Sequence, residues 1–516
     1  MNRILSIHNS HNSSICEIKD NTIIYFQEAE RLDKIKRSSN WTILLNKYQN
    51  QIFDQIIFIN AVDSSENKLH LDKNYFLKIL EDYNIKYNNF KFDVNHHFYH
   101  ACAAFYNSGY EKSFVLVIDG HGVRDLKKLE IISCYYFYKN KFKKIFKLYS
   151  SKDREYVKGK NVFINTLSLG HFYSQVKEIL NFKEEGSVMG LSSYGNEIFE
   201  DKFFVDKFNH FQSVQSLMYN MHLENIKEKK VLMCRTAQRE IERIIFKYVK
   251  NIIKNKKRNL CVSGGVFQNT VLNSKLLDIC PNLYVDPFAD DSGISIGAAL
   301  YDMNKEKFIK NKIKTLNLGD LPNYSDLDLK KGKQVTYKDV AKIISNKNIV
   351  AIYQGKNELG KRALGNRSFL YDPRDYHAKD KINYLKNREW FRPTAGTILH
   401  EHANEWFDLK SKKETPFMSY VFKVKKNNIP GITHVDNTCR IQTLKKEQNY
   451  HYYNLINEFY KITGIPILLN TSFNLAGEPL VNSVYDAIKT LTNSNNKFKF
   501  IYFPEIGKIY ETKDFI

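Results

Sequence analysis

The sequence predicts a mixed α/β protein with two domains. Its length of 516 residues and its hydrophobic content of 43% allow more than one core, at the usual size of about 100–200 residues per domain. Strand-like runs alternate with segments of helical periodicity, and one combination of strand, polar loop and hairpin occurs twice. Together these observations predict the α/β class and an internal pseudo-repeat.

Both copies of the strand-and-hairpin pattern lie in the first half of the chain. In the first copy, strand-like residues 4–7 precede a predicted hairpin of residues 14–18 and 22–26. In the second, residues 114–118 lead into a polar loop, and residues 131–138 and 145–149 form the next predicted hairpin. Apolar residues at three- and four-residue steps predict helices over 97–107 and 236–253.

A change in composition indicates a domain junction between residues 305 and 337. This stretch is charged, contains Gly319, Pro322 and Asn323, and has little apolar periodicity. We therefore expect a first domain over residues 1–325 and a second over 326–516. The second domain is expected to begin with a strand at 348–353 and to contain a very apolar strand at 465–469.

The composition argues against a membrane-spanning protein, a disulfide framework and a zinc site. No run approaches the roughly 18–20 apolar residues of a membrane span, and seven cysteines without a CxxC pattern suggest neither a disulfide framework nor a zinc site. We expect a soluble, cytoplasmic protein. The net charge of +22 would suit a nucleic-acid partner, but the lysines are dispersed and the abundance of Lys, Asn, Ile, Tyr and Phe is typical of AT-rich codons. We favour the compositional explanation and expect no specific nucleic acid.

Two histidines and two aspartates form the first group that could carry chemistry. His96 and His100 are four residues apart, so on a helix their imidazoles share a face, as metal ligands must. Such a pair alone is equally typical of polar surface residues. Asp119 and Asp291 follow strand-like runs, where active-site loops belong, and the four side chains together suit Fe(II), Mn(II) or a related divalent ion. For the neighbouring Asp290 we prefer a role as a turn residue.

A second group lies where a predicted strand ends in small residues, Ser263, Gly264 and Gly265, before a helix. Free backbone N–H groups and the helix dipole at such a turn suit a phosphate. Many tight turns need glycine for backbone conformation alone, so this pattern is only moderately specific. Residues 293–299 are small and predict a helix that packs closely against its neighbours.

The second domain contains a near match to a P-loop and a dense group of cationic and amide side chains. Residues 355–362 follow a strand, but Arg362 stands where a P-loop needs Ser or Thr to bind magnesium, so we reject that interpretation. The larger group is suited to bidentate recognition of a phosphate or carboxylate. It consists of Arg362, Asn366, Arg367, Lys386, Arg388, Arg392, Arg440, Asn470 and Ser472.

Seven short motifs stand in a fixed order along the chain. They are HHFYHA at 96–101, VMGL to YG at 188–195, GGV at 264–266, RALGNRS at 362–368, REWFRP at 388–393, THVD at 433–436 and LNTSFN at 469–474. Together they resemble the carbamoyltransferases of the nodulation, aminoglycoside and cephamycin type, collinearly from Ser6 to about Asp486. The sequence departs from that pattern at Asn12, Ser187 and Lys361, where Asp, Lys and Pro are common.

The resemblance implies a fold and a set of site residues. It implies an N-terminal actin-like (ASKHA) ATPase-type domain, similar to the tRNA threonylcarbamoyl-transferring enzymes, and a C-terminal α+β carbamoyl-phosphate-binding domain. It also implies that His11 lies beside the acceptor, with Glu28 and Glu30 behind it. His11 is the best candidate base, because the reference pKa of a histidine side chain, about 6.5, suits proton removal near neutrality, and a purely hydrogen-bonding role is the alternative. The implied metal ligands are His96, His100, Asp119 and Asp291; the nucleotide contacts are Ser263, Gly264, Gly265 and Asn269; the carbamoyl-phosphate contacts are Lys386, Arg392, Arg440 and Ser472, with Arg362, Asn366, Arg367 and Asn470 close by.

The resemblance further implies an ATP-dependent carbamoyltransferase. Such an enzyme makes carbamoyl adenylate from carbamoyl phosphate and ATP, and transfers the carbamoyl group to a hydroxyl of a small-molecule or glycan acceptor. The implied cofactors are Fe(II) or Mn(II) at the histidine and aspartate group and Mg(II) with ATP, and a homodimer is compatible with this interpretation. Two alternatives stay open from the sequence: a tRNA-interacting threonylcarbamoyl-type protein and an actin-like small-molecule kinase.

Overall fold

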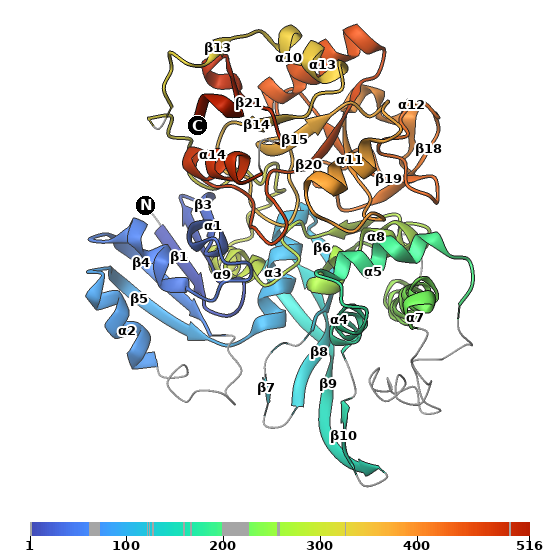
Figure 1. Ribbon diagram of the computed structural model, residues 1–516. Helices are drawn as coiled ribbons and strands as arrows, with labels where there is room; N and C mark the ends of the chain where they lie inside the picture. The colour runs from blue at the N-terminus through green and yellow to red at the C-terminus, as the bar shows by residue number, and fades with distance from the viewer. Residues whose placement is uncertain are drawn as a thin grey trace. The chain divides into compact units, whose positions relative to one another are not determined.

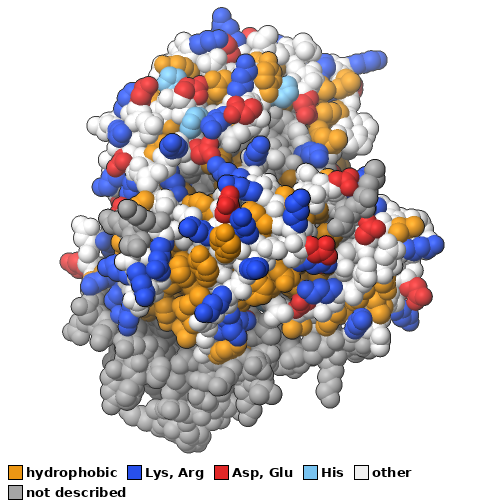
Figure 2. Space-filling view, turned by 180° about the vertical axis from the view of Figure 1, so that it is seen from behind, with side chains coloured by type: hydrophobic (Ala, Val, Ile, Leu, Met, Phe, Trp, Pro, Cys, Tyr) orange, Lys and Arg blue, Asp and Glu red, His pale blue; other side chains and the backbone are white. Residues whose placement is uncertain are grey.

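The computed structural model describes residues 3–60, 73–120, 122, 124–125, 128–157, 160–165, 168–198, 226–254, 258–325, 327–494 and 497–515. They form two compact units, which are described separately. The first unit comprises Met1–Ile23 and Ser39–Ile313, and the second comprises Ile24–Ser38 and Lys314–Ile516. No helix in these ranges is long and apolar enough to cross a membrane. Figure 2 shows Lys and Arg side chains scattered over one face among acidic and apolar ones, which agrees with the dispersed charge in the sequence.

The first unit begins with a sheet whose strand order is β3-β2-β1-β4-β5 (Figure 1). Its central strand β1 pairs antiparallel with β2 and parallel with β4. Ile4, Leu5 and Ile7 of β1 are buried, because a central strand is covered on both faces. The strands are β1 (Arg3–His8), β2 (Ser14–Lys19), β3 (Thr22–Glu28), β4 (Ile52–Ile59) and β5 (Lys86–Asp93), and the residues of β3 from Ile24 on are grouped with the second unit.

The second sheet repeats this plan in the order β10-β9-β8-β6-β11-β12. Its central strand β6 again pairs antiparallel with the next hairpin strand, β8, and parallel with β11. The duplicated order confirms the predicted pseudo-repeat and is the arrangement expected of an actin-like domain. The strands are β6 (Lys112–Ile118), β8 (Lys128–Tyr138), β9 (Lys141–Val157), β10 (Lys160–Asn165), β11 (Leu260–Ser263) and β12 (Leu283–Val285), with the short β7 (Arg124–Asp125) beside β8.

The helices of the first unit follow the same duplication. α3 (His96–Ser108) follows the last strand of the first sheet, α9 (Gly293–Asn304) follows the last strand of the second, and the two helices pack together. A Cβ on Gly297 would lie 1.9 Å from the carbonyl oxygen of Tyr99, so the small residues of α9 permit this approach, as the sequence predicted. The others are η1 (Trp41–Tyr48), α2 (Lys73–Asp82), α4 (Leu169–Ile179), α5 (Glu185–Leu191), α7 (Ile226–Ile253) and α8 (Thr270–Leu276).

The second unit contains a mixed ten-stranded sheet in the order β13-β22-β21-β14-β15-β20-β16-β19-β18-β17. The predicted strands at 348–353 and 465–469 correspond to β14 and β20. The strands are β13 (Lys333–Gln334), β14 (Val350–Tyr353), β15 (Arg367–Tyr371), β16 (Ala395–Leu399), β17 (Phe407–Asp408), β18 (Val421–Val424), β19 (Thr438–Leu444), β20 (Ile467–Ser472), β21 (Phe500–Phe503) and β22 (Lys508–Glu511). The helices are α1 (Glu30–Asp33), α10 (Tyr337–Ser345), α11 (Ala378–Leu385), α12 (Ala403–Trp406), α13 (Tyr450–Thr463) and α14 (Val484–Asn493).

The loop between β14 and β15 is organised by one buried carboxylate. Glu358 accepts hydrogen bonds from the backbone N–H groups of Leu364 at 2.8 Å, Asn366 at 3.2 Å and Arg367 at 2.7 Å. The element that follows this loop is a strand, so the strand, loop and helix of a P-loop are not formed here, in agreement with the rejection made from the sequence. The loop instead presents Arg362 and its neighbours from a fixed backbone.

Candidate metal centre and anion site

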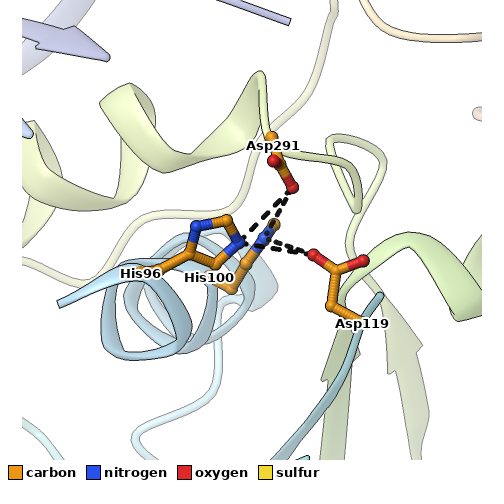
Figure 3. Close-up of side chains that lie close together, drawn as sticks. All are labelled: His96, His100, Asp119 and Asp291. Carbon is orange, nitrogen blue, oxygen red and sulfur yellow. Dashed lines mark hydrogen bonds and ion pairs between the residues drawn. The ribbon is translucent and has the colours of Figure 1, made fainter. Parts of the chain in front are cut away.

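Four predicted ligands converge in the first unit (Figure 3). His96 and His100 lie on the first turns of α3, Asp119 directly follows β6, and Asp291 precedes α9. One ligand atom from each of the four side chains lies within 4.8 Å of the others. The Nε2 atom of His96 is 3.3 Å from Asp119 Oδ2 and 3.4 Å from Asp291 Oδ1, and the Nε2 atom of His100 is 3.5 Å from the same two oxygens.

The charges in this cluster balance one another. Burial lowers the pKa of His96, but the charges of Asp291 and Asp119 and their hydrogen bonds outweigh burial and raise it to about 10. Burial raises the pKa of both aspartates, but the two histidines and, for Asp291, His11 outweigh it and hold both pKa values below their usual range. Protons on the imidazoles therefore offset the carboxylate charge, a role that a bound metal cation would take over.

The four residues fit a divalent cation. Two imidazoles and two carboxylates are a mixed nitrogen and oxygen set of the kind that Fe(II) and Mn(II) accept. The Nε2 atom of His100 is buried and has no hydrogen-bond partner among the described residues, although it faces the two carboxylates. A buried nitrogen without a hydrogen bond is costly unless a ligand completes it.

His100, Ser263 and Asp286 form a hydrogen-bonded chain. The Nδ1 atom of His100 lies 3.3 Å from Ser263 Oγ, and Ser263 donates to Asp286 Oδ2 at 3.1 Å. Asp286 is buried, and burial raises its pKa to about 6. Partners of this kind fix the tautomer and the ring orientation of a metal-binding histidine. Asp286 was not singled out from the sequence, although it directly follows β12 just as Asp119 directly follows β6.

The glycines after β11 lie against the end of β6. Gly264 has a φ of 97°, and a Cβ there would lie 2.3 Å from the carbonyl oxygen of Ile118. The N–H of Gly265 donates to Asp119 Oδ1 at 3.1 Å. Both glycines therefore have a conformational reason to be present, and their contact with a nucleotide stays a prediction.

Two further predicted residues of the first unit have polar partners. Asn269 caps α8 by accepting a hydrogen bond from the N–H of Leu272 at 3.0 Å, and it donates to Gln238 Oε1 at 2.8 Å. The Nδ1 atom of His11 lies 3.2 Å from Asp291 Oδ2, and the His11 side chain is 55% exposed. Asp291 thus touches both the candidate base and the histidine cluster.

The sheet register of the second unit aligns several predicted anion contacts. Arg440 of β19 pairs with Ala395 of β16, and Ala395 pairs with Asn470 of β20. Residues opposite one another in neighbouring strands project to the same face, so Arg440 and Asn470 share a face with Ser472, two positions further along β20. The ammonium group of Lys386 donates to Ser472 Oγ at 3.0 Å.

Arg440 is the centre of a cluster of like charges. Its burial, followed by the charges of Arg362, Arg392 and Arg388, pushes the pKa of Arg440 well below the usual range. No described residue accepts a hydrogen bond from its guanidinium, and its Nε atom is buried. Arg392 lies 3.8 Å from the Glu389 carboxylate. Three cationic side chains thus gather around one buried guanidinium, and guanidinium groups suit a phosphate.

Comparisons with known proteins decide the family. The model described as Carbamoyltransferase N-terminus matches residues 55–300, and the model described as Carbamoyltransferase C-terminus matches residues 341–503. Nodulation protein NolNO of Sinorhizobium fredii is 31% identical over 94% of this chain and 77% of its own length. The chain belongs to the carbamoyltransferase family. The membership confirms the resemblance predicted from the seven motifs and makes the protein a carbamoyl-transferring enzyme.

Two further relatives agree with this membership. Nodulation protein NolO of Bradyrhizobium diazoefficiens is 34% identical over 78% of this chain and 76% of its own length. An uncharacterized protein of Methanocaldococcus jannaschii is 31% identical over 95% of this chain and 97% of its own length. Among solved structures, full-length HypF in its phosphate- and nucleotide-bound form is 14% identical, with a TM-score of 0.38, and covers 58% of this chain and 55% of that one. The fold assignment rests on the strand orders of the two sheets.

The remaining predicted residues of this carbamoyltransferase hold the loop between β14 and β15. Both terminal nitrogens of Arg367 donate hydrogen bonds, and its guanidinium lies 3.7 Å from the centre of the Tyr353 ring. Asn366 accepts a hydrogen bond from Asn449 at 2.7 Å, and Asn470 donates to the carbonyl oxygen of Ala363 at 3.1 Å. The acceptors of Arg367 are the carbonyl oxygens of Gln354, Gly355 and Asn366 and the Oδ1 atom of Asn357.

Proposed function

We propose that this carbamoyltransferase makes carbamoyl adenylate in its second unit and transfers the carbamoyl group to an acceptor hydroxyl in its first. The observation that supports the first step best is the cluster of like charges around Arg440, because its charge and geometry suit the phosphate group of carbamoyl phosphate. The second step is supported by the histidine and aspartate cluster, with His11 beside it. The nucleotide substrate is ATP.

The first step divides into two bond changes. Water adds to the carbonyl carbon of carbamoyl phosphate and the bond to the phosphate oxygen breaks, which gives carbamate and phosphate. A carbamate oxygen then attacks the α-phosphorus of ATP, and pyrophosphate leaves. Arg440, Arg392 and Arg362 bind the phosphate of the substrate, and Lys386 and Ser472 orient the carbamoyl end. Cationic groups placed in advance stabilise the negative charge that develops on the leaving oxygens.

The second step forms a bond between the acceptor oxygen and the carbonyl carbon, and AMP leaves. Asp291 holds Nδ1 of His11, so Nε2 is the nitrogen that accepts the hydroxyl proton. His96, His100, Asp119 and Asp291 would hold Fe(II) or Mn(II), which when bound supplies Lewis-acid stabilisation of the carbamoyl oxygen. The hydrogen bond from His100 to Ser263 keeps Nε2 of His100 facing the carboxylates.

The exchange of labelled pyrophosphate into ATP tests this proposal. The purified protein should catalyse the exchange only when carbamoyl phosphate is present, because pyrophosphate returns to ATP only through the adenylate. With an acceptor added, the nucleotide product should be AMP. ADP as the product would instead support a kinase, and transfer without any exchange would support direct attack on carbamoyl phosphate; either result would overturn the proposed sequence of steps.

A further inference from the structure

A segment near the start of the chain helps to build the second unit. Residues Ile24–Ser38 belong to that unit, although the rest of the unit begins at Lys314. The N–H of Phe26 donates to the carbonyl oxygen of Leu318 at 3.0 Å, and the hydroxyl of Tyr25 donates to Asp320 at 2.9 Å. Lys34, which ends α1, pairs with Asp486 of α14. The segment is therefore held to the rest of the second unit at Tyr25, Phe26 and Lys34.

The segment contains a buried ion pair, Glu28 with Arg31, that binds the backbone of Gly360. Glu28 and Arg31 have side chains that are 1% and 4% exposed, and Arg31 Nε lies 3.0 Å from Glu28 Oε2. A terminal nitrogen of Arg31 donates to the carbonyl oxygen of Gly360 at 2.8 Å, and the N–H of Gly360 donates to the same Glu28 oxygen at 3.4 Å. The pair thus satisfies both polar groups of Gly360.

Stability alone accounts poorly for this arrangement. A buried ion pair costs much of its attraction in desolvation, so apolar side chains of similar size would often stabilise a fold as well. Gly360 also has a φ of 83°, a conformation that other residues rarely adopt, so its backbone is held in one unusual state. A neighbouring pair, Lys361 with Glu30 at 3.7 Å, ties the next residue to the same segment.

The held peptide stands immediately before the anion site. Arg362 follows Gly360 by two residues, and its charge acts on Arg440. The like charges of Arg362 and Arg440 repel each other, so the backbone that carries Arg362 has to be held in place. Glu358 fixes the other side of the loop at Leu364, Asn366 and Arg367. The ion pair fixes the side on which Arg362 lies.

We propose that Glu28 and Arg31 are positioning residues of the anion site. They hold the Gly360 peptide so that Arg362 approaches Arg440 against the repulsion between them, and the cluster is ready when the phosphate arrives. This inference rests on the proposed binding of carbamoyl phosphate. It gives the N-terminal segment a role in adenylate formation in addition to its role in the fold.

The test compares variants of one segment. In Arg31→Lys the positive charge stays, but the single ammonium replaces the planar fork that joins Glu28 and Gly360. Glu28→Gln keeps the shape and an oxygen acceptor while it removes the charge. Lys34→Met is the matched control, because it breaks a different ion pair of the segment, whose lysine is 38% exposed, and the hydrogen bond from Lys34 to the carbonyl oxygen of Arg31, while it leaves the contacts of Gly360 in place. All are made in the full chain, and far-UV circular dichroism and the melting temperature verify folding.

Two readouts separate positioning from folding. The dissociation constants of inorganic phosphate and carbamoyl phosphate, measured by calorimetry, should rise about 10- to 100-fold in Arg31→Lys, since misplacement by about 1 Å can cost 100-fold. In Glu28→Gln the same two dissociation constants should rise at least threefold. The KM for carbamoyl phosphate in pyrophosphate exchange should rise in parallel, and the KM for ATP should stay unchanged. Lys34→Met should match the wild type in both dissociation constants and both KM values.

Any other result would overturn either this inference or the proposed function. Folded Arg31→Lys and Glu28→Gln proteins that bind phosphate as the wild type does would overturn the inference, and so would equal losses in Lys34→Met. If Arg31→Lys does not fold, Glu28→Gln alone decides: a rise of less than threefold in its dissociation constants would overturn the inference. A wild-type protein that binds neither phosphate nor carbamoyl phosphate would overturn the proposed function itself, which is distinct from wild-type binding that the variants leave unchanged.

Discussion

The two charged clusters of the molecule are built on opposite plans. In the first unit, two histidines and two aspartates of opposite charge meet, and the pKa of His96 rises to about 10 because the carboxylates outweigh its burial. In the second unit, like charges surround Arg440, and burial together with those charges lowers its pKa. Opposite charges therefore offset one another in the first cluster, whereas like charges meet in the second.

This difference bears on what each cluster is proposed to bind and on the expected result of losing one of its members. A cation enters the first cluster only by displacing protons from imidazole, so its ligands must be correctly oriented in advance. An anion entering the second cluster displaces no charge and removes a repulsion. Losing a member of the first cluster therefore leaves charge unbalanced, and losing a member of the second removes binding while it relieves strain between charges.

The largest expected effect concerns the balanced cluster. The double variant His96→Ala/His100→Ala removes both nitrogen ligands, so it should hold no stoichiometric metal after reconstitution with Mn(II), as measured by mass spectrometry. Transfer activity should fall by more than the roughly 10–100-fold typical of damage to outer partners alone. His11→Ala is the control: it stands beside Asp291 without being a predicted ligand, so it should keep its metal. Stoichiometric metal in the double variant would refute the ligand assignment.

A second comparison separates the two chemical steps. Arg392→Ala and Arg440→Ala should lower carbamoyl-phosphate-dependent pyrophosphate exchange by at least about 100-fold, because the phosphate loses charged partners in a buried site. With synthetic carbamoyl adenylate these variants should still carbamoylate the acceptor, whereas His100→Ala should not. Equal failure of the arginine variants with the adenylate would show that the two clusters do not divide the work as proposed.

A third prediction concerns the support of His100. Ser263→Ala removes the hydrogen-bond partner of Nδ1, so the affinity for Mn(II) should fall about 10- to 100-fold in an equilibrium titration followed by electron paramagnetic resonance. Ser274→Ala is the matched control, because this buried serine donates to the carbonyl oxygen of Thr270 within its own helix and is not among the predicted site residues. If ATP affinity falls in Ser263→Ala and Mn(II) affinity does not, Ser263 is the nucleotide contact that the resemblance implies.

The sequence predicted the features that local periodicity encodes. The pseudo-repeat follows from alternating strands and turns, and the histidine and aspartate cluster follows from helical spacing and strand ends, which are both short-range patterns. The place of Glu28 and Arg31 could not be read in this way. Their contact with Gly360 joins residues more than 300 positions apart, and no local pattern shows which unit a short segment will join.

The sequence also could not distinguish the two buried arginines of the second unit. Arg367 and Arg440 both lie in the predicted anion-binding group, and only the fold supplies or withholds their partners. Arg367 donates to four oxygens, whereas Arg440 donates to none of the described residues. Whether a buried side chain finds hydrogen-bond partners depends on tertiary contacts, so residue type and spacing do not determine it.

The smallest expected effect follows from this contrast between the arginines. Arg440→Met removes a buried, unsatisfied charge from a group of like charges, so the ligand-free protein should be more stable by about 1 kcal/mol while exchange activity is lost, as substitutions that remove strain from functional sites often do. Arg367→Met, the matched control, leaves four oxygens without their donor and should destabilise the protein by at least about 2 kcal/mol. Denaturant unfolding of the ligand-free variants measures both. If Arg440→Met is as destabilising as Arg367→Met, then Arg440 contributes to the fold as Arg367 does, and the proposed contrast between a balanced cluster and one that requires an anion is wrong.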